Sequence, residues 1–184
     1  MTICLATTDR EIQEIKDLQK VNLKDNVTAE NRLSDGFLTA EYEFDFLKAM
    51  NDLTPAIIAK QNGRVVGYAL ATDRSLLAQH PLLKDLGTQI NKIPFGGKFI
   101  GDFDYLVVGQ LCVAKEVRGR GLAQDLYAQF KATYESRYPF AITDVDRENL
   151  ASLKTHLKVG LITLSTLNYG DSNWDVVVWD WRNT

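Results

Sequence analysis

The chain has 184 residues, a hydrophobic fraction of 45%, a charged fraction of 24% and a formal net charge of −3. These values suit one folded domain with one core and are ordinary for a globular protein. The slightly acidic balance gives no general attraction to nucleic acid or to an anionic membrane surface.

Segments that would direct the chain to a membrane or an oxidising compartment are not evident. No apolar run approaches the roughly 20 residues that span a bilayer, and the first residues do not have the pattern of a signal peptide. Cys4 and Cys112 form neither a metal-binding spacing nor a disulfide framework, so each is expected to be a small buried residue. We therefore expect a cytoplasmic protein with no bound metal.

The N-terminal third predicts a strand followed by helices. Residues 2–7 are short and apolar, as in a strand. Thr8 and Glu11 have the spacing of a capping box, and apolar residues follow them at helical intervals. Residues 26–36 are polar and predict loop or a short helix, whereas the apolar positions within 42–50 indicate a further helix.

A β-hairpin is the clearest local prediction. Residues 56–60 and 64–70 resemble strands, and Asn62-Gly63 between them supplies the positive φ angles of a tight turn. Residues 75–101 then predict an insertion with one or two helices, which is long for a connection between strands. Such an insertion would either cover core or border a binding pocket as a lid or specificity element.

Strands and helices alternate in the second half of the chain. The predicted elements are strands at 105–113 and 140–145, helices at 122–137 and 150–159, and a closing hairpin of 161–167 with 174–181 around a turn at 168–171. Gly160 suits the end of the second helix because glycine accepts a left-handed conformation. This mixed order predicts an α/β (α+β) fold with a partly antiparallel sheet, in a single domain over residues 1–184.

A glycine-containing loop joins the strand at 105–113 to the next helix. It reads Arg118-Gly119-Arg120-Gly121-Leu122-Ala123. The first N–H groups of a helix lack intrahelical partners and, with the helix dipole, attract anions. The two glycines let backbone approach an anion closely, and the two arginines add charge unless they are only solvated. No Gly-Lys-Ser/Thr follows and position 124 is Gln, so the loop is neither a P-loop nor a dinucleotide fingerprint. The prediction is a phosphate or pyrophosphate site, with an ordinary turn as the alternative.

A polar face is predicted on the helix at 150–159. Asn149, Ser152 and His156 have the spacing of neighbours on one helix face, which can border a cleft. An apolar stripe runs beside them: Leu150, Leu153 and Leu157. Taken by itself, the helix favours a plainer interpretation, in which Asn149 is an N-cap and the Ser and His face solvent.

Two segments together resemble a known family. Residues 111–123, Leu111-Cys112-Val113-Ala114-Lys115-Glu116-Val117-Arg118-Gly119-Arg120-Gly121-Leu122-Ala123, resemble the core motif of the GNAT family of N-acetyltransferases, Arg/Gln-x-x-Gly-x-Gly/Ala after an apolar strand. Residues 149–161 resemble the family's next motif, an Asn followed eleven residues later by Gly and an apolar residue. The hairpin resembles the paired strands before the core motif. The resemblance covers roughly residues 55–73 and 104–181 and implies a GNAT-like fold, a central twisted mixed β-sheet flanked by helices.

The resemblance also implies an activity and a site. The activity is transfer of an acetyl group from acetyl-CoA to an amine acceptor, by direct attack in a ternary complex. The residues implied to bind coenzyme A are Arg118, Gly119, Arg120, Gly121, Leu122 and Ala123 at the pyrophosphate, and Leu111, Cys112, Val113 and Asn149 at the pantetheine arm. A backbone N–H near Cys112 or Val113 would stabilise the tetrahedral oxyanion. His156 occupies a position where Tyr is common and is the candidate general acid for the departing thiolate.

One departure from the family pattern leaves the catalytic base open. Some members carry a Glu near the middle of the core strand, where this chain has Val107. The side chains that could orient a water instead are Asp102, Asp104, Tyr105 and Gln110. A non-catalytic coenzyme A-binding sensor or interaction module is therefore the alternative function. The acceptor stays open between a small amine and a peptide or protein amine. A homodimer also stays open, since three tryptophans suit an interface or the core: Trp174, Trp179 and Trp181.

Overall fold

The computed structural model describes residues 1–169 and 172–182, apart from the side chain of Leu33. In chain order the elements are β1 Thr2–Leu5, α1 Asp9–Val21, α2 Ala29–Asp35, α3 Phe44–Leu53, β2 Ile57–Gln61, β3 Arg64–Asp73, α4 Pro81–Ile90, β4 Pro94–Phe95, β5 Lys98–Phe99, β6 Leu106–Val113, α5 Leu122–Tyr134, β7 Phe140–Asp146, α6 Leu150–Lys158, β8 Ile162–Tyr169 and β9 Ser172–Asp180. Within these described residues, no helix is both long and apolar enough to cross a membrane.

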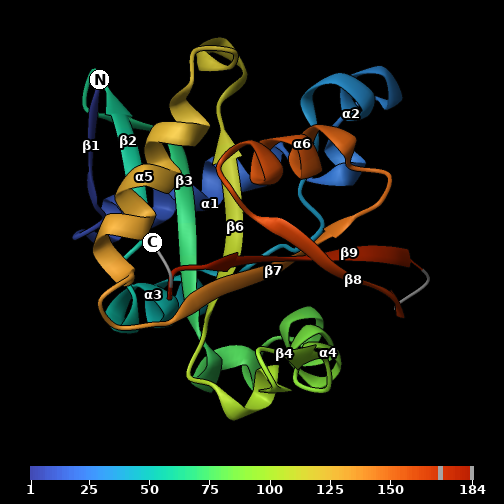
Figure 1. Ribbon diagram of the computed structural model, residues 1–184. Coiled ribbons are helices and arrows are strands. Elements are labelled where there is room, and N and C mark those ends of the chain that lie inside the picture. Colours follow the sequence, from blue (N-terminus) through green and yellow to red (C-terminus); the bar gives the residue numbers. More distant parts are fainter. Residues whose placement is uncertain (170–171, 183–184) are drawn as a thin grey trace.

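Seven strands form the central sheet in the order β1-β2-β3-β6-β7-β9-β8 (Figure 1). The pair β6–β7 is parallel, whereas each other neighbouring pair is antiparallel. The helix α5 provides the crossover that a parallel pair requires, because the chain must return to the same end of the sheet. The predicted mixed sheet flanked by helices is confirmed.

The N-terminal local predictions are also confirmed. Thr8 caps α1 by accepting a hydrogen bond of 3.3 Å from the Glu11 backbone N–H, and the Glu11 carboxylate accepts one of 3.0 Å from the Thr8 N–H. The strands β2 and β3 pair around Asn62 and Gly63, whose φ angles are 52° and 76°. These signals depend on neighbouring residues alone, which is why the sequence was sufficient to find them.

Two apolar layers bury the faces of the sheet. One lies under α1, α3 and α4, and its members include Ile12, Leu47 and Leu86. The other lies under α5 and includes Leu126 and Phe130. Figure 1 shows α5 and α6 in front of the sheet, with α1 and α3 behind it. Each of the three tryptophans is less than 9% exposed, so all three belong to the core.

The segment between β3 and β6 corresponds to the predicted insertion at 75–101. It contains a 3₁₀ turn, the helix α4 and the short hairpin β4–β5, and lies at one end of the sheet (Figure 1). Its apolar side chains join the first layer: Leu76, Leu77, Leu83, Leu86, Ile90, Ile93 and Ile100. Covering the core is thus one role of this segment.

Several predicted boundaries need correction. The helix α3 begins at Phe44, so Tyr42 precedes it as a buried residue of the connecting chain. The helix α5 ends at Tyr134 instead of Arg137. The predicted turn at 168–171 is partly strand, because Tyr169 pairs with Ser172 and Asn168 with Asn173. The turn residues 170 and 171 lie outside the described part of the chain.

Candidate functional site

The strands β6 and β7 separate in the middle of the sheet. They pair only at Leu106 with Ala141 and at Val107 with Ile142. Beyond that point β6 stays paired with β3 as far as Val113. The side of β6 that faces β7 is therefore open from Val108 onward, apart from a hydrogen bond of 2.9 Å from the Thr143 hydroxyl to the Val108 carbonyl.

A bulge at Gly109 accompanies this separation. The register between β3 and β6 shifts so that Leu70 faces Gln110 while Ala71 faces Val108, which leaves Gly109 unmatched. A Cβ at Gly109 would lie 2.5 Å from the Thr72 hydroxyl oxygen, so a larger residue would force the strands apart. Because bulges bend the strand that carries them, this one fits the divergence of β6 from β7.

A cavity of about 680 Å³, here called the loop cavity, opens where the strands have separated. Most of the predicted coenzyme A residues border it: Leu111, Cys112, Val113, Arg118, Gly119, Gly121, Leu122 and Ala123. The predicted residue Arg120 is exposed and does not line it. The remaining walls come from the chain around α2 and from α6.

The glycines of the loop leave its backbone accessible. Gly119 and Gly121 have φ angles of 74° and 82°, which favour glycine over residues with a Cβ. Gly121 is the N-cap of α5, and no side chain caps that helix end. A Cβ built at Gly119 would meet nothing within 4 Å. The open space, the helix N-terminus and the cavity beside it together fit a pyrophosphate.

Arg118 serves the loop differently from the prediction of added charge. Its guanidinium donates hydrogen bonds to the Val113 carbonyl at 2.8 Å and to the Asn22 side chain at 2.6 Å. It also forms an ion pair of 3.2 Å with Asp35. Arg118 thus holds the loop against β6, the end of α1 and the end of α2.

Two lysines that the sequence analysis missed also border the loop cavity. Ala151, Lys154, Thr155 and Lys158 all line it from α6. Their spacing of i, i+3, i+4 and i+7 identifies one face of a helix. This periodicity is present in the sequence, on the helix face next to the one that carries His156. The two lysines bring positive charge beside the glycine loop.

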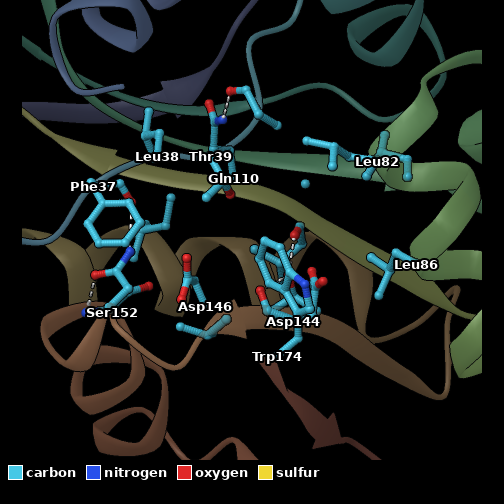
Figure 2. Close-up of a pocket in the computed structure, with 18 of the residues that line it drawn as sticks. Phe37, Leu38, Thr39, Leu82, Leu86, Gln110, Asp144, Asp146, Ser152 and Trp174 are labelled. Carbon is cyan, nitrogen blue, oxygen red and sulfur yellow. Dashed lines mark hydrogen bonds between the residues drawn. The ribbon is translucent and has the colours of Figure 1, made fainter. Parts of the chain in front are cut away.

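A smaller cavity of about 80 Å³, here called the acidic cavity, lies between β6 and β7. Figure 2 shows Asp144 and Asp146 on one side of it, Thr39 and Gln110 across from them, and the α4 leucines at one end. Four residues line both cavities: Phe37, Leu38, Leu111 and Ser152. The two cavities therefore adjoin at the end of β6 that the separation leaves open.

The two aspartates have different partners. The Asp146 carboxylate is buried and forms an ion pair of 3.2 Å with Lys24. The Asp144 carboxylate accepts a hydrogen bond from the Tyr169 hydroxyl. Burial raises the pKa of Asp144 to about 7, and the nearby Asp146 charge contributes to the rise.

This acidic pair was not among the site residues predicted from the sequence. Asp144 and Asp146 occupy alternate positions of the strand predicted at 140–145 and observed at Phe140–Asp146. Alternate strand residues share one face of a sheet. Two carboxyl groups on the buried face of an apolar strand are costly unless they have a partner or a role, and this was the available signal.

The plainer interpretation of this helix, in which His156 faces solvent, is wrong. His156 is 5% exposed, and its Nδ1 lies 2.7 Å from the Ser152 carbonyl oxygen. Because a carbonyl can only accept, Nδ1 carries the proton. Burial lowers the pKa of His156, so the ring is neutral at neutral pH. In the apolar stripe, Leu150 and Leu157 face outward and are exposed by 52% and 42%, whereas Leu153 packs against the second apolar layer.

Asn149 is the N-cap of α6, as the sequence suggested. Its side-chain oxygen accepts a hydrogen bond of 3.3 Å from the Ser152 N–H, and its amide donates one of 2.7 Å to the Phe37 carbonyl. It borders the acidic cavity instead of the loop cavity. Asn149 thus holds the residues shared by the two cavities in place.

The side chains considered for relaying a proton are dispersed. Of Asp102, Asp104, Tyr105 and Gln110, only Gln110 lines the acidic cavity. Its oxygen accepts hydrogen bonds from Tyr68 at 2.7 Å and Gln19 at 3.0 Å, and its amide donates one of 2.7 Å to the Ala40 carbonyl. These hydrogen bonds use both the oxygen and the nitrogen of the Gln110 amide, so its role here is to form part of the cavity wall. Val107 is fully buried and apolar.

Comparison with known proteins gives one family match. A sequence profile described as the acetyltransferase (GNAT) family matches residues 24–161. No curated protein matches the chain. The matched range contains β6, the glycine loop, α5, β7 and α6, each of which contributes residues to the two cavities.

Solved structures resemble the whole chain at low sequence identity. The structure of smu.2055 from Streptococcus mutans has a TM-score of 0.65 and 14% identity, with 98% of this chain and 99% of that chain covered. A ribosomal-protein-alanine N-acetyltransferase from Brucella melitensis has a TM-score of 0.61 and 18% identity, covering 98% and 99%. The structure of yncA from Salmonella typhimurium with its cofactor acetyl-CoA has a TM-score of 0.62 and 15% identity, covering 98% and 94%. At these identities the likeness establishes the fold.

Proposed function

The chain belongs to the acetyltransferase (GNAT) family, and we propose that it transfers an acetyl group from acetyl-CoA to an amine within a ternary complex. The observation that carries this proposal is the meeting of two cavities where β6 and β7 separate. One cavity borders the glycine loop and the other contains two carboxyl groups, and they share Leu111 and Ser152. A thioester at the shared wall would be reached by an amine from the acidic side.

Coenzyme A is proposed to occupy the loop cavity. Its pyrophosphate would meet the backbone of residues 118–123 at the start of α5, where the helix N–H groups and the glycine conformations suit an anion. Lys154 and Lys158 would add opposite charge to its phosphates. The pantetheine arm would follow the open side of β6 at 111–113. Asn149, the N-cap of α6, would hold Phe37 and Ser152 in place beside it.

The bound thioester would supply an activated acyl group, and the protein's own contribution would be position and charge. Holding an amine and a thioester in register removes much of the entropic cost of a reaction between two molecules. A backbone N–H near Cys112 or Val113 would stabilise the oxyanion that forms. Burial raises the pKa of Cys112 to about 12, so its thiol would stay neutral and take no nucleophilic part.

The surroundings of His156 give little support to its proposed role as general acid. Its neutral ring carries the proton on Nδ1, which is directed at the Ser152 carbonyl oxygen. A proton held in that bond is not offered to a leaving thiolate. His156 also lies edge-on to Tyr127, with ring centroids 5.6 Å apart. A packing role beneath the shared wall is therefore favoured over proton donation.

The proposal is tested by binding and turnover with the purified chain. We expect acetyl-CoA to raise the melting temperature and to release free thiol only when a suitable primary amine is present. ATP at the same concentration serves as the control for general phosphate binding. Thermal protection by coenzyme A without thiol release across a broad amine panel would favour the alternative, a coenzyme A sensor. Absence of protection by coenzyme A would reject both functions.

A further inference from the structure

We propose that Asp144 binds the ammonium form of the acceptor and removes its proton, and that the acceptor is a small primary amine with no carboxylate beside its nitrogen. The inference rests on the proposed acetyl transfer and names the substrate class and the base for it. The core strand β6 has Val107 where a base could stand, and Asp144 supplies a base from the neighbouring strand β7.

The position of Asp144 allows this role. It borders the acidic cavity from β7, on the face of the strand that also carries Asp146 (Figure 2). That cavity adjoins the loop cavity at Leu111 and Ser152. A nitrogen held near Asp144 therefore lies in the space that opens toward the proposed thioester position.

The charges in the acidic cavity leave Asp144 without a cationic partner. Lys24 neutralises Asp146 at 3.2 Å and reaches Glu148 at 2.9 Å. Within residues 1–169 and 172–182, no lysine, arginine or histidine forms an ion pair with Asp144. A carboxylate in a narrow cavity is stabilised by a cation that enters with its own hydrogen-bond donors. An ammonium group supplies both.

The other titratable groups around Asp144 are poorer bases. They come from the elements that enclose the acidic cavity: Tyr42 before α3, Asp146 on β7, His156 on α6 and Tyr169 on β8, with Lys24 behind Asp146. Burial raises the pKa of Tyr42 and lowers the pKa of His156, and Lys24 forms an ion pair with Asp146. The Tyr169 hydroxyl donates its hydrogen bond to Asp144 itself. The pKa of Asp144, about 7, suits proton transfer near neutrality.

The walls of the acidic cavity restrict the rest of the acceptor. Its volume of about 80 Å³ is small beside the roughly 300–1,000 Å³ of a typical ligand pocket. Leu82, Leu86 and Trp174 provide apolar surface for an alkyl or aryl arm. A carboxylate on the carbon next to the nitrogen would approach the Asp144 carboxylate and be repelled. Amines are therefore preferred to the matching amino acids.

The ammonium transfers one proton to the Asp144 carboxylate, and the neutral nitrogen forms a bond to the acyl carbon of acetyl-CoA. The carbon–sulfur bond breaks as the amide forms, and the second nitrogen proton leaves with the thiolate to give coenzyme A as the free thiol. Asp144 then releases its proton to solvent, which restores the carboxylate.

Matched substrates test the acceptor class. Thiol release is compared for phenethylamine against phenylalanine and for isopentylamine against leucine, since each pair differs by one carboxylate. We expect kcat/KM to be at least about 100-fold higher for the amines, because like charges repel strongly in a poorly solvated cavity. Equal rates for amines and amino acids would overturn the assignment of the acceptor class.

The variant Asp144→Asn tests the base. We expect the acetyl-CoA Kd to be unchanged, kcat/KM for the amine to fall by at least about 100-fold, and the rise of activity through pH 7 to disappear. Asp175→Asn is the control, because Asp175 is a half-buried aspartate of β9 that lines neither cavity. It should keep the wild-type pH profile.

The outcomes separate this proposal from the proposed function. If wild-type protein binds acetyl-CoA but acetylates none of the amines or amino acids, acetyl transfer itself is contradicted. If it acetylates them while Asp144→Asn retains the rise near pH 7, acetyl transfer stands and the role of Asp144 is rejected.

Discussion

Arg118 donates a hydrogen bond of 2.8 Å from its Nε to the carbonyl oxygen of Val113. This bond fixes the glycine loop to the last residue of β6, directly beside the loop cavity. Through its contacts with Asn22 and Asp35, the same side chain also fixes the opposite wall of that cavity. The shape of the loop cavity therefore depends on a residue that the sequence had suggested mainly as a source of charge.

The substitution Arg118→Ala should weaken both the fold and coenzyme A binding. Loss of charge-assisted hydrogen bonds at a half-buried site should cost about 1–2 kcal/mol of unfolding free energy, and the loosened loop should raise the acetyl-CoA Kd. Chemical denaturation and isothermal titration measure the two effects. Arg120→Ala is the control, since Arg120 is exposed outside the cavity. An equal effect of both substitutions on the Kd would indicate that charge alone matters.

Gly121→Asp should abolish acetyl-CoA binding while the protein still folds. The new carboxylate would stand at the uncapped start of α5, where we propose that the pyrophosphate binds, and would repel it. Gly63→Asp is a matched control, because Gly63 also has a positive φ, of 76°, with nothing within 4 Å of its Cβ position, but lies in the β2–β3 turn. Titration calorimetry with both variants checks this, and wild-type affinity in Gly121→Asp would reject the loop as the pyrophosphate site.

Leu82→Ala should alter the choice of acceptor without altering cofactor affinity. Leu82 is half-buried on α4 and lines the acidic cavity, but it does not line the loop cavity. Removing its side chain should raise KM for small amines and improve the use of bulkier ones. Lys84→Ala, on the exposed side of the same helix, should change neither. Deleting residues 75–101 would be a poorer test of a lid, because their apolar side chains complete the core.

His156 should make the fold sensitive to mild acid. Burial lowers its pKa below the 6.5 of an exposed histidine. As the pH falls through 6.5, the unfolded chain gains a proton that the folded protein resists, so this contribution to stability is present above pH 6.5 and lost below it. We expect the melting temperature of His156→Gln to fall less than that of wild type between pH 7 and pH 5. Parallel curves for the two proteins would contradict this expectation.

Asp144 should contribute to stability with the opposite sign. Its pKa rises from 3.8 to about 7 on folding, so its stability cost appears as pH rises between these values and is complete above pH 7. Asp144→Asn should therefore raise the melting temperature at pH 8 and raise it less at pH 5. An unchanged or lower melting temperature at pH 8 would show that the charged form is not disfavoured by the fold. Asp175→Asn again provides the comparison.

The elements with local signals were predictable from the sequence. The capping box at Thr8 and Glu11 and the turn at Asn62-Gly63 involve residues at most four apart, so short segments specify them. The start of α3 was harder to predict, because Tyr42 lies outside the helix. Tyr42 has the apolar spacing of a helix, but its hydroxyl reaches the Gly109 carbonyl at 3.2 Å, a contact with a residue 67 positions away. Long-range contacts of this kind override local periodicity.

The sequence by itself determined the loop at 118–123 and its strand-to-helix setting, because glycine conformations and helix N-termini are local properties. Only the tertiary structure decided that Asp144 and Asp146 face a cavity, that Lys24 neutralises one of them, and that His156 points inward. Which strand lies beside β6, and where the two strands separate, depends on packing across the whole sheet. The anion site could thus be predicted from adjacent residues, whereas the acidic cavity exists only where distant strands meet and then diverge.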